Sequence, residues 1–307
     1  MTFIREATVT VNIRKGDFSG YEIPPIEISG LRVSFSILKS LAWSTNSAVI
    51  KIWNLSQSIR NIIKDYGDQV ILYAGYERGS GTQLLYLGDT TAVSHIYEFP
   101  EIVTILECGD GEKYLNQLRV SVSFAANTPA RSVISAIAQQ MGIEFVEFAS
   151  TENLVYRQGF KGIGMGKDVL TNACNKLGLQ WSVQNNQLQI IPLDGSIQQT
   201  PIEINENTGM QGVPTRFTYR SLYLYRPIEV NPLQAPLAPS IPPSRPVGYK
   251  VNTILNPLIL PGSAVNLTSN HLGIKGPFRV ENVRHEGDTY GFVWSSNLEL
   301  TQLNSTP

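Results

Sequence analysis

The chain has 307 residues, which at about 150 residues per domain predicts two domains or three small ones. Hydrophobic residues make up 42% of it and charged residues 16%, whereas an average soluble domain is about 25% charged. This composition excludes a disordered chain. The net charge of −1 excludes a polycationic nucleic-acid binder, because contacts to phosphates need a surplus of Lys and Arg on one face.

Signals for targeting and redox chemistry are missing from the sequence. The first ten residues alternate between polar and apolar, without a basic segment before an apolar core, so no secretory signal is expected. No apolar run approaches the roughly 18 residues that span a bilayer, so we expect no membrane insertion. Cys108 and Cys174 lack Cys-x-x-Cys spacing. They are predicted to be buried free thiols in a chain made in a reducing cytosol.

The first third of the chain has the composition of β-strands. Ser56 is expected to cap a short helix that runs to about residue 65, and Gly67 is expected to end it. Gly79-Ser80-Gly81 is typical of a hairpin turn. Short turns between consecutive strands predict an antiparallel barrel or sandwich. Segments rich in Val, Ile, Tyr and Thr predict strands at residues 7–13, 31–38, 48–55, 69–76, 84–97 and 102–108.

The middle third predicts a small α/β domain at residues 118–203. Thr128 is the expected N-cap of a helix, with Pro129 in its first position. Gly142 is expected to end this helix in the left-handed conformation, and a strand follows at residues 143–146. The same helix–Gly–strand pattern returns 36 residues later, with Gly178 in the place of Gly142. The apolar stripes of the two predicted helices are Val133, Ile134, Ile137, Ala138 and Met141, and Val169, Leu170, Ala173, Cys174 and Leu177.

The second strand of this domain is predicted to turn at Asn185-Asn186 and to return over residues 187–191. The last third is again β, with predicted strands at residues 216–226 and 249–255. Between them lie seven prolines, which predict an extended, polyproline-like segment because each lacks an amide donor. These are Pro227, Pro232, Pro236, Pro239, Pro242, Pro243 and Pro246.

Two short motifs recur in the same order in the two β regions. Residues 67–72 are similar to residues 262–267, and each stretch contains a Gly-x-x-Val-x-Leu pattern. Val93-Ser94-His95 is similar to Val283-Arg284-His285, and each triplet precedes a turn and a long closing strand. The repeated order predicts two related barrels in one chain.

The candidate nucleotide-binding and metal-binding residues do not have the spacing that such sites require. The stretch 162–168, Gly-Ile-Gly-Met-Gly-Lys-Asp, lacks the first Gly and the Ser or Thr of a P-loop, and also the third Gly of a dinucleotide-binding turn. It predicts a flexible loop before a capped helix. His95, His271 and His285 show no paired metal-ligand spacing. The matching places of His95 and His285 favour a role in the fold, such as a hydrogen bond at a strand end.

Candidate catalytic groups are no better supported. No Gly-x-Ser-x-Gly nucleophile motif is present. Glu98 and Glu101 flank a Pro turn, whereas Glu144 and Glu147 bracket a predicted strand, so both pairs are expected at the solvated surface. We therefore expect no catalytic residue, no cofactor and no metal.

Several stretches together resemble the baseplate hub proteins of contractile-tailed phages, a family related to the hubs of contractile injection systems. The resemblance begins with Ser47-Ala48-Val49-Ile50-Lys51-Ile52-Trp53-Asn54-Leu55-Ser56 and runs in order through nearly the whole chain. The further matching stretches are residues 68–76, 87–89, 178–183, 208–214, 258–262 and 276–300, the last with Val283-Arg284-His285-Glu286-Gly287-Asp288 and Trp294.

The resemblance implies a mainly β fold with an α/β insertion, in which two tube-type antiparallel β-barrels accompany a small α/β domain. The expected domains are a first barrel at residues 1–117, the α/β domain at 118–203 and a second barrel at 204–307, which the Pro-rich segment 227–246 interrupts. The family implies a homotrimer whose six barrels continue a sixfold tail tube. Its implied partners are the tail tube or a tube-initiator protein, the central spike protein and other baseplate proteins, with DNA only in transit through the lumen.

The Pro-rich segment is not part of the family pattern, so its role is inferred from its own chemistry. Such a segment has little backbone freedom left to lose on docking, which favours contact with a neighbouring subunit or baseplate protein. The predicted contact residues are Pro232, Pro236, Pro239, Pro242 and Pro243. Two other functions stay open at this point. One is a receptor- or glycan-binding tail module, and the other is a cell-wall hydrolase.

Overall fold

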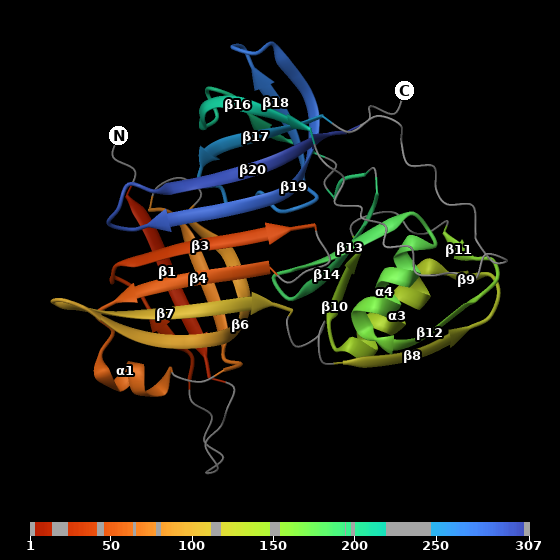
Figure 1. The fold of residues 1–307 in the computed structure, drawn as a ribbon, viewed down its shortest axis with the longest axis horizontal. Coiled ribbons are helices and arrows are strands. Elements are labelled where there is room, and N and C mark those ends of the chain that lie inside the picture. The colour runs from red at the N-terminus through yellow and green to blue at the C-terminus, as the bar shows by residue number, and fades with distance from the viewer. Residues whose placement is uncertain are drawn as a thin grey trace.

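The computed structural model shows a β-rich body beside a smaller α/β part (Figure 1). In the described part of the chain, thirteen strands belong to one sheet, and the α/β part has three small sheets of its own. The mainly β fold expected from the sequence is therefore confirmed at this level. The structure describes residues 4–13, 24–41, 46–63, 66–77, 81–111, 118–147, 154–193, 195–197, 200–218 and 247–303.

The first β region contains every strand predicted for it, with ends that differ by a few residues. Its strands pair in the order β3-β4-β7-β6-β5-β1-β2, and all of these pairings are antiparallel. Burial alternates along β3, as expected for a strand with one face on a core. The elements are β1 (Arg5–Asn12), β2 (Ile26–Ile28), β3 (Val33–Ser40), β4 (Asn46–Trp53), α1 (Gln57–Ile62), β5 (Gln69–Tyr76), β6 (Gly81–Glu98) and β7 (Glu101–Asp110).

The short helix α1 begins as predicted and ends earlier. The Ser56 hydroxyl accepts a hydrogen bond from the Ile59 amide at 3.3 Å, so Ser56 is the N-cap. The helix ends at Ile62, and Ile63 is its C-cap, so the prediction that Gly67 ends it is wrong. The fully buried side chain of Ile63 packs into the core, and its backbone has left the helical conformation. Gly67 lies instead in the turn before β5, at a φ of 93°.

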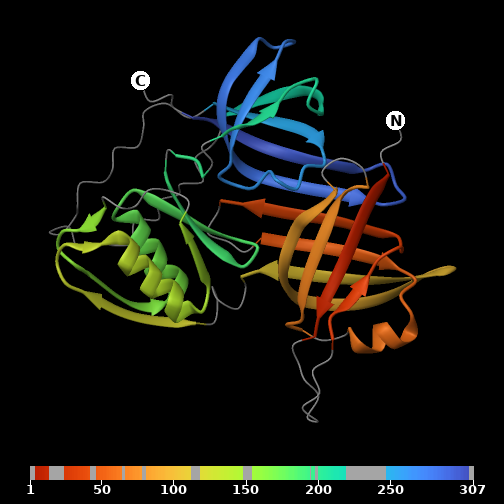
Figure 2. The ribbon, with the colours of Figure 1, turned by 180° about the vertical axis from the view of Figure 1, so that it is seen from behind.

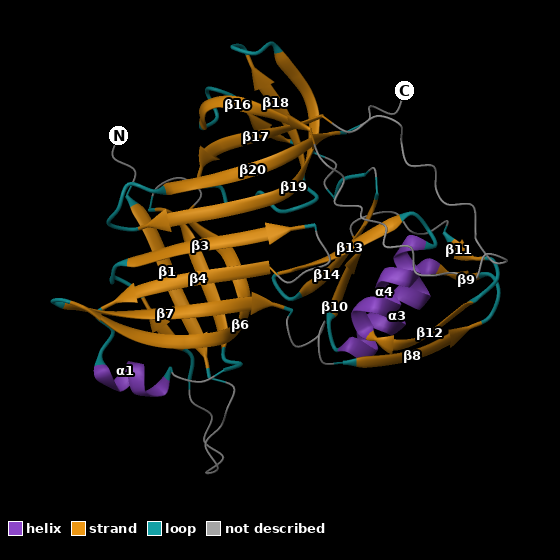
Figure 3. Cartoon of the chain, in the orientation of Figure 1, coloured by secondary structure: helices purple, strands orange, loops and turns teal. Residues whose placement is uncertain are grey.

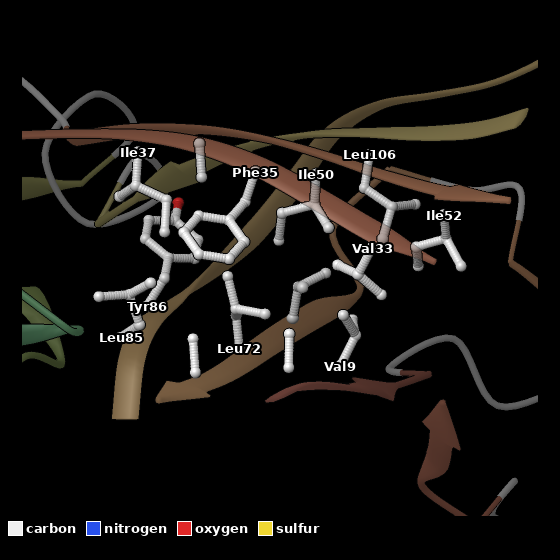
Figure 4. Close-up of a cluster of buried hydrophobic side chains, with 14 of the residues drawn as sticks. Val9, Val33, Phe35, Ile37, Ile50, Ile52, Leu72, Leu85, Tyr86 and Leu106 are labelled. Carbon is white, nitrogen blue, oxygen red and sulfur yellow. The ribbon is translucent and has the colours of Figure 1, made fainter. Parts of the chain in front are cut away.

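One apolar core fills the first β region. Side chains from β3, β4 and β7 meet side chains from β1, β5 and β6, so the strands face one another across the core (Figure 4). Val9, Ile50 and Leu72 have no exposed surface. Each such aliphatic side chain stabilises the fold by about 1.5–3 kcal/mol relative to exposure.

The α/β part carries the two predicted helix–Gly–strand units (Figure 3). The apolar stripe of each helix faces one shared core, and only Leu177 at the end of the second stripe is partly buried. Asn185 and Asn186 both have positive φ in a two-residue hairpin turn, as predicted. The elements are β8 (Arg119–Phe124), β9 (Thr128–Pro129), α3 (Ala130–Met141), β10 (Glu144–Glu147), β11 (Val155–Tyr156), β12 (Phe160–Met165), α4 (Gly166–Asn175), β13 (Leu179–Gln184) and β14 (Gln187–Pro192).

The start of α3 differs from the prediction by one position. Thr128 and Pro129 form the short strand β9, which pairs with β11, so they are extended rather than helical. The Thr128 hydroxyl donates to the Ala125 carbonyl at 2.8 Å and does not cap the helix. Pro129 is the N-cap, and no side chain caps α3 there. The pairing with β11 therefore prevails over the local capping signal.

Replacing Gly142 with Val should destabilise the protein by about 1 kcal/mol or more, because a β-branched residue is strained at positive φ. Gly142 ends α3 at a φ of 67°, and Gly178 follows α4 at 68°. We expect Gly178→Val to cost a similar amount. The control is Gly276→Val, because a side chain at Gly276 meets open space and its φ is not positive. Urea unfolding of the three variants measures the effect, and equal stability of Gly142→Val and the parent would contradict it.

The second β region continues the same sheet (Figure 2). Strand β3 of the first region pairs antiparallel with β19 of the second, so the sheet runs from one region into the other. The strand predicted at residues 216–226 begins earlier, at Met210, and residues 219–226 lie outside the described residues. The strands are β15 (Ile202–Ile204), β16 (Met210–Thr218), β17 (Val247–Ile254), β18 (Ala264–Ser269), β19 (Ile274–Asp288) and β20 (Trp294–Gln302).

The two β regions repeat one arrangement of five strands. The first region pairs its strands in the order β3-β4-β7-β6-β5, and the second pairs its strands in the order β16-β17-β20-β19-β18. A bulge leaves Thr91 of β6 unpaired against β7, and a bulge leaves Glu281 of β19 unpaired against β20. The histidine follows four residues later in each case, at His95 and at His285. The repeat therefore extends from the strand order to the register.

Candidate functional site

The predicted contact segment cannot be placed. Pro232, Pro236, Pro239, Pro242 and Pro243 lie within residues 219–246, which are outside the described residues. Their role in contacting a neighbour stays a prediction.

The glycine-rich stretch serves packing between a strand and a helix. Residues 162–165 belong to β12, which pairs with β8, so the prediction of a flexible loop is wrong. A Cβ on Gly162 would lie 2.5 Å from Cγ1 of Val169 in α4. A Cβ on Gly166 would lie 2.8 Å from Cγ of Met141 in α3. The predicted helix cap is also absent, because α4 begins after Met165 without a side-chain cap. The glycines let the strand and the two helices approach closely.

The two cysteines are buried free thiols, as predicted. Burial raises the pKa of Cys108 to about 12 and shifts the pKa of Cys174 in the same direction. Both are therefore neutral at pH 7, and the neutral thiol is a poor nucleophile. In the described part of the chain, no group of three or more His, Cys, Asp or Glu residues is placed to hold a metal ion. None of the helices in that part has the length and apolar character that crossing a membrane requires.

His95 and His285 make the same contact in the two repeats. Nδ1 of His95 lies 3.0 Å from the hydroxyl of Thr104, its partner across β6 and β7. Nδ1 of His285 lies 2.8 Å from the hydroxyl of Ser296, its partner across β19 and β20. Burial lowers the pKa of His285 to about 3, so this histidine is neutral at pH 7. The fold role predicted for both histidines is thus a cross-strand hydrogen bond to a hydroxyl.

A buried polar cluster joins the first β region to the α/β part. The carboxylate of Asp110, at the end of β7, accepts hydrogen bonds from the amides of Asn185 and Asn186, each at 2.7 Å. The side-chain amide of Asn46 donates to the same carboxylate at 3.2 Å and to the Val183 carbonyl at 2.8 Å. The hairpin turn of β13 and β14 is therefore held at the ends of β4 and β7. We call these residues, with Lys39, the junction cluster.

Lys39 completes the junction cluster from β3. Its ammonium group has no exposed surface and donates to Oδ1 of Asn185 at 2.8 Å. Burial lowers the pKa of Lys39 to about 8, and the nearby Asp110 charge partly opposes this shift. Burial also raises the pKa of Asp110, against the hydrogen bonds from the turn and the charge of Lys39. The cluster thus contains one acid and one base that share a single buried site.

Between about pH 8 and 10.5, the free energy of unfolding of the parent protein should rise relative to that of the Lys39→Met variant. The unfolded chain keeps the lysine proton up to about pH 10.5, whereas the folded chain releases it near pH 8. The unfolded state therefore binds more protons in this window, and the parent gains about 3 kcal/mol across it. Lys275→Met is the control, because Lys275 is exposed. Urea unfolding at pH 7, 8, 9 and 10 tests this, and parallel curves for the parent and Lys39→Met would contradict it.

A second buried contact joins the second β region to the α/β part. Arg279 and Glu281 of β19 form a salt bridge of 2.7 Å, in which their side chains are 7% and 8% exposed. Arg279 also donates to the carbonyls of Leu193 and Gly195, just after β14. The hydroxyl of Thr301 donates to Glu281. The α/β part is therefore attached to both β regions through buried, charged hydrogen bonds.

The repeats differ in how much of each histidine strand is exposed. His285 has no exposed surface, whereas His95 is exposed at the matching position. Next to His95, the side chains of Ile96 and Tyr97 are 44% and 65% exposed. Val213 of β16, at the end of the sheet, is 52% exposed. Exposed apolar side chains thus lie on β6 and on β16, and we take these two strands as the candidate assembly surface.

A family model described as Baseplate hub gp41 matches residues 8–219, which is more than half of the chain. The chain belongs to the baseplate hub gp41 family. The resemblance found in the sequence is thereby confirmed, and the chain is a structural component of a phage tail baseplate. No curated protein matches the chain in sequence.

Solved structures share the fold at low sequence identity. A tail protein from Neisseria meningitidis MC58 is 13% identical with a TM-score of 0.64, and the match covers 96% of each chain. The 43 kDa tail protein of prophage MuSo2 from Shewanella oneidensis is 11% identical with a TM-score of 0.64, covering 97% of this chain and 98% of that one. The c3393 protein of E. coli, a type VI secretion component, is 10% identical with a TM-score of 0.56, covering 96% and 77%.

Proposed function

We propose that three copies of this hub form a ring of six tube-type β-barrels, which adapts a sixfold tail tube to a threefold central spike. The observation that carries the proposal is the repeat of five strands with its bulge and its histidine contact. A sixfold partner docks without mismatch on three chains only if each chain offers two similar surfaces, and the repeat supplies them. The chains would thus form a homotrimer.

Two features support the barrels and their boundaries. Strands β1, β5 and β6 face β3, β4 and β7 across one core, as the walls of a barrel do. The three apolar cores contain residues 7–108 with Leu255 and Trp294, residues 120–190 and residues 204–300. We accordingly propose units at residues 1–117, 118–203 and 204–307. No catalytic role is proposed, because the family is structural.

The exposed face of the second β region suits a passage for DNA. A hollow of about 530 Å³ opens there, lined by β3, β16, β17, β19 and β20. Most of its lining is uncharged, as at Gln211, Asn252 and Asn297. The charge of Lys250 is paired with Glu299 at 2.8 Å, and Arg284 is a further cation of the lining. A lining with few cations makes few contacts to phosphates, so the DNA can pass in transit.

The proposed partners are the tail tube or a tube-initiator protein, the central spike protein and other baseplate proteins. The c3393 protein of E. coli, which shares the fold, is described as a secretion-system component similar to phage tail proteins. The Pro-rich segment would contact a neighbouring subunit or one of these proteins. Deleting residues 232–243 should leave folding intact and weaken assembly, and normal assembly of the deletion variant would contradict this role.

Light scattering and electron microscopy test the proposal. The expected result is a trimer of three times 33.9 kDa, about 102 kDa, seen as a threefold ring with an open lumen. A stable dimer or hexamer would overturn it. If the isolated chain is a monomer, purified tails are imaged, and the absence of a threefold ring of this chain in the baseplate would overturn the proposal. Clear zymogram activity on peptidoglycan, or stoichiometric zinc, would overturn the non-enzymatic role.

A further inference from the structure

The two repeats of one chain are joined edge to edge by β3 and β19. Residues 282–288 of β19 pair antiparallel with residues 34–40 of β3, with His285 opposite Ile37. Strand β20 lies on the other edge of β19, so this stretch has a neighbour on both sides. The His285 side chain has no exposed surface, and the backbone of Ile259 and the charge of Lys39 lie close to it. We call the five repeated strands of the first β region the first repeat and those of the second β region the second repeat. Each junction of this kind needs one strand from a first repeat and one from a second repeat.

The first repeat contains the same histidine stretch with only one neighbour. Residues 92–98 of β6 correspond to residues 282–288 of β19, because both follow the bulge and both contain the histidine. In the described part of the chain they pair with β7 alone, since β5 reaches only to Asp89 of β6. This leaves one edge of residues 92–98 open, and Ile96 and Tyr97 in this stretch are 44% and 65% exposed.

The second repeat contains a counterpart of β3 that is also paired on one side. Strand β16 pairs with β17 alone in the described residues. Arg216 of β16 lies opposite Tyr249, as Ile37 of β3 lies opposite Ala48. Tyr249 pairs with Leu300, which lies four residues after Ser296, the hydroxyl partner of His285. Ala48 pairs with Cys108, which lies four residues after Thr104, the hydroxyl partner of His95. Tyr249 and Ala48 therefore occupy the same place in their repeats. Arg216 is therefore the counterpart of Ile37.

We propose that residues 93–96 of β6 in one copy pair antiparallel with residues 215–218 of β16 in a second copy, in the register of the junction between β19 and β3. This proposal rests on the proposed ring and names the surface that closes it. Transferring the register places Ser94 opposite Phe217, His95 opposite Arg216 and Ile96 opposite Thr215. The occupant is a second copy because the chain itself already forms the equivalent junction once.

Backbone hydrogen bonds and the burial of apolar surface both favour the pairing of the two copies. An exposed strand edge presents unpaired amides and carbonyls that can pair with another strand. The pairing also places the side chain of Ile96, which is 44% exposed in the single chain, beside Thr215 of the second copy. Because β6 and β16 are different strands, the contact is heterologous, so successive copies add in one direction. In the proposed ring, the rotation between copies closes this series after three chains.

Cysteine cross-linking tests the register. Residues directly opposite in antiparallel strands have Cα atoms about 4.5–5.5 Å apart, which a disulfide can bridge. The double variant Ile96→Cys with Thr215→Cys, oxidised in the trimer or in purified tails, should give covalent dimers and trimers on a non-reducing gel. The largest product should run at three times 33.9 kDa. Neither single variant should cross-link, because the contact joins two different strands.

The chain offers a matched positive control and a register control. Glu286 lies opposite Ser36 within one chain, in the place that corresponds to Ile96 and Thr215. Glu286→Cys with Ser36→Cys should therefore close an intramolecular disulfide without a change in mass. Ile96→Cys with Arg216→Cys should fail, because a slip of one residue moves the side chain to the other face of the sheet. Native Cys108 and Cys174 are buried.

Each outcome decides the proposal. Cross-linked dimers and trimers from the double variant alone support it. A trimer that forms while the double variant stays uncross-linked, with the positive control closed, overturns the strand pairing and leaves the proposed ring standing. Cross-linking by a single variant would join the same strand of two copies, so it would overturn the pairing of β6 with β16 in favour of a twofold contact. An intramolecular product would show that a segment of the same chain occupies the β16 edge. If no ring of this chain exists in solution or in tails, the proposed function fails.

Discussion

Replacing Asp110 with Ala should lower the free energy of unfolding by about 3 kcal/mol or more. The substitution leaves the amides of Asn185 and Asn186, the side chain of Asn46 and the ammonium of Lys39 without their shared carboxylate. Removing one partner from a buried charged cluster costs about 3–5 kcal/mol, because the remaining charge and donors stay buried. Asp110 is fully buried, so water cannot replace the carboxylate without opening the junction.

Two measurements check this prediction. Urea unfolding gives the loss of stability, and hydrogen exchange should show faster exchange at the amides of Asn185 and Asn186. Asp168→Ala is the control, because Asp168 is exposed in the first turn of α4, where a carboxylate contributes less than about 1 kcal/mol. Equal losses for the two substitutions would show that the junction cluster does not hold the α/β part to the sheet.

Local signals in the sequence located most elements but not their partners. The strands of the first region follow from runs of Val, Ile and Tyr, and the Asn185-Asn186 turn follows from the tolerance of Asn for positive φ. The pairing of β3 with β19 joins strands that are 250 residues apart at Ser36 and Glu286, and no local pattern specifies it. The errors at Gly67, Thr128 and the stretch 162–165 have the same origin. In each case a tertiary contact prevails over a local capping or loop signal.

One feature of the sequence points to the junction cluster. Along β3, Val33, Phe35 and Ile37 alternate onto the buried face, and Lys39 is next in that alternation. A lysine on the apolar face of a strand requires a buried partner, and this requirement could have directed attention to an acidic residue. The identity of that residue as Asp110 depends on the pairing of β4 with both β3 and β7, which only the structure gives.

Replacing Arg279 with Met should cost about 3 kcal/mol or more, whereas Lys250→Met should cost less than about 1 kcal/mol. Arg279 and Glu281 are 7% and 8% exposed, so the single substitution leaves an uncompensated buried carboxylate on β19. It also removes the donor to the carbonyls of Leu193 and Gly195. Lys250 and Glu299 form a salt bridge of similar length, 2.8 Å, but are 58% and 30% exposed, so water compensates there.

The double variant Arg279→Met with Glu281→Met separates the charge from the packing. Replacing a whole buried ion pair with apolar side chains is often close to neutral, so the double variant should lose less stability than Arg279→Met alone. Urea unfolding of the two single variants, the double variant and the parent provides the comparison. A double variant that loses the sum of the two single losses would show that the buried charge pair itself does not couple these positions. Equal losses for Arg279→Met and Lys250→Met would show that burial does not set the strength of the contact between the second repeat and the α/β part.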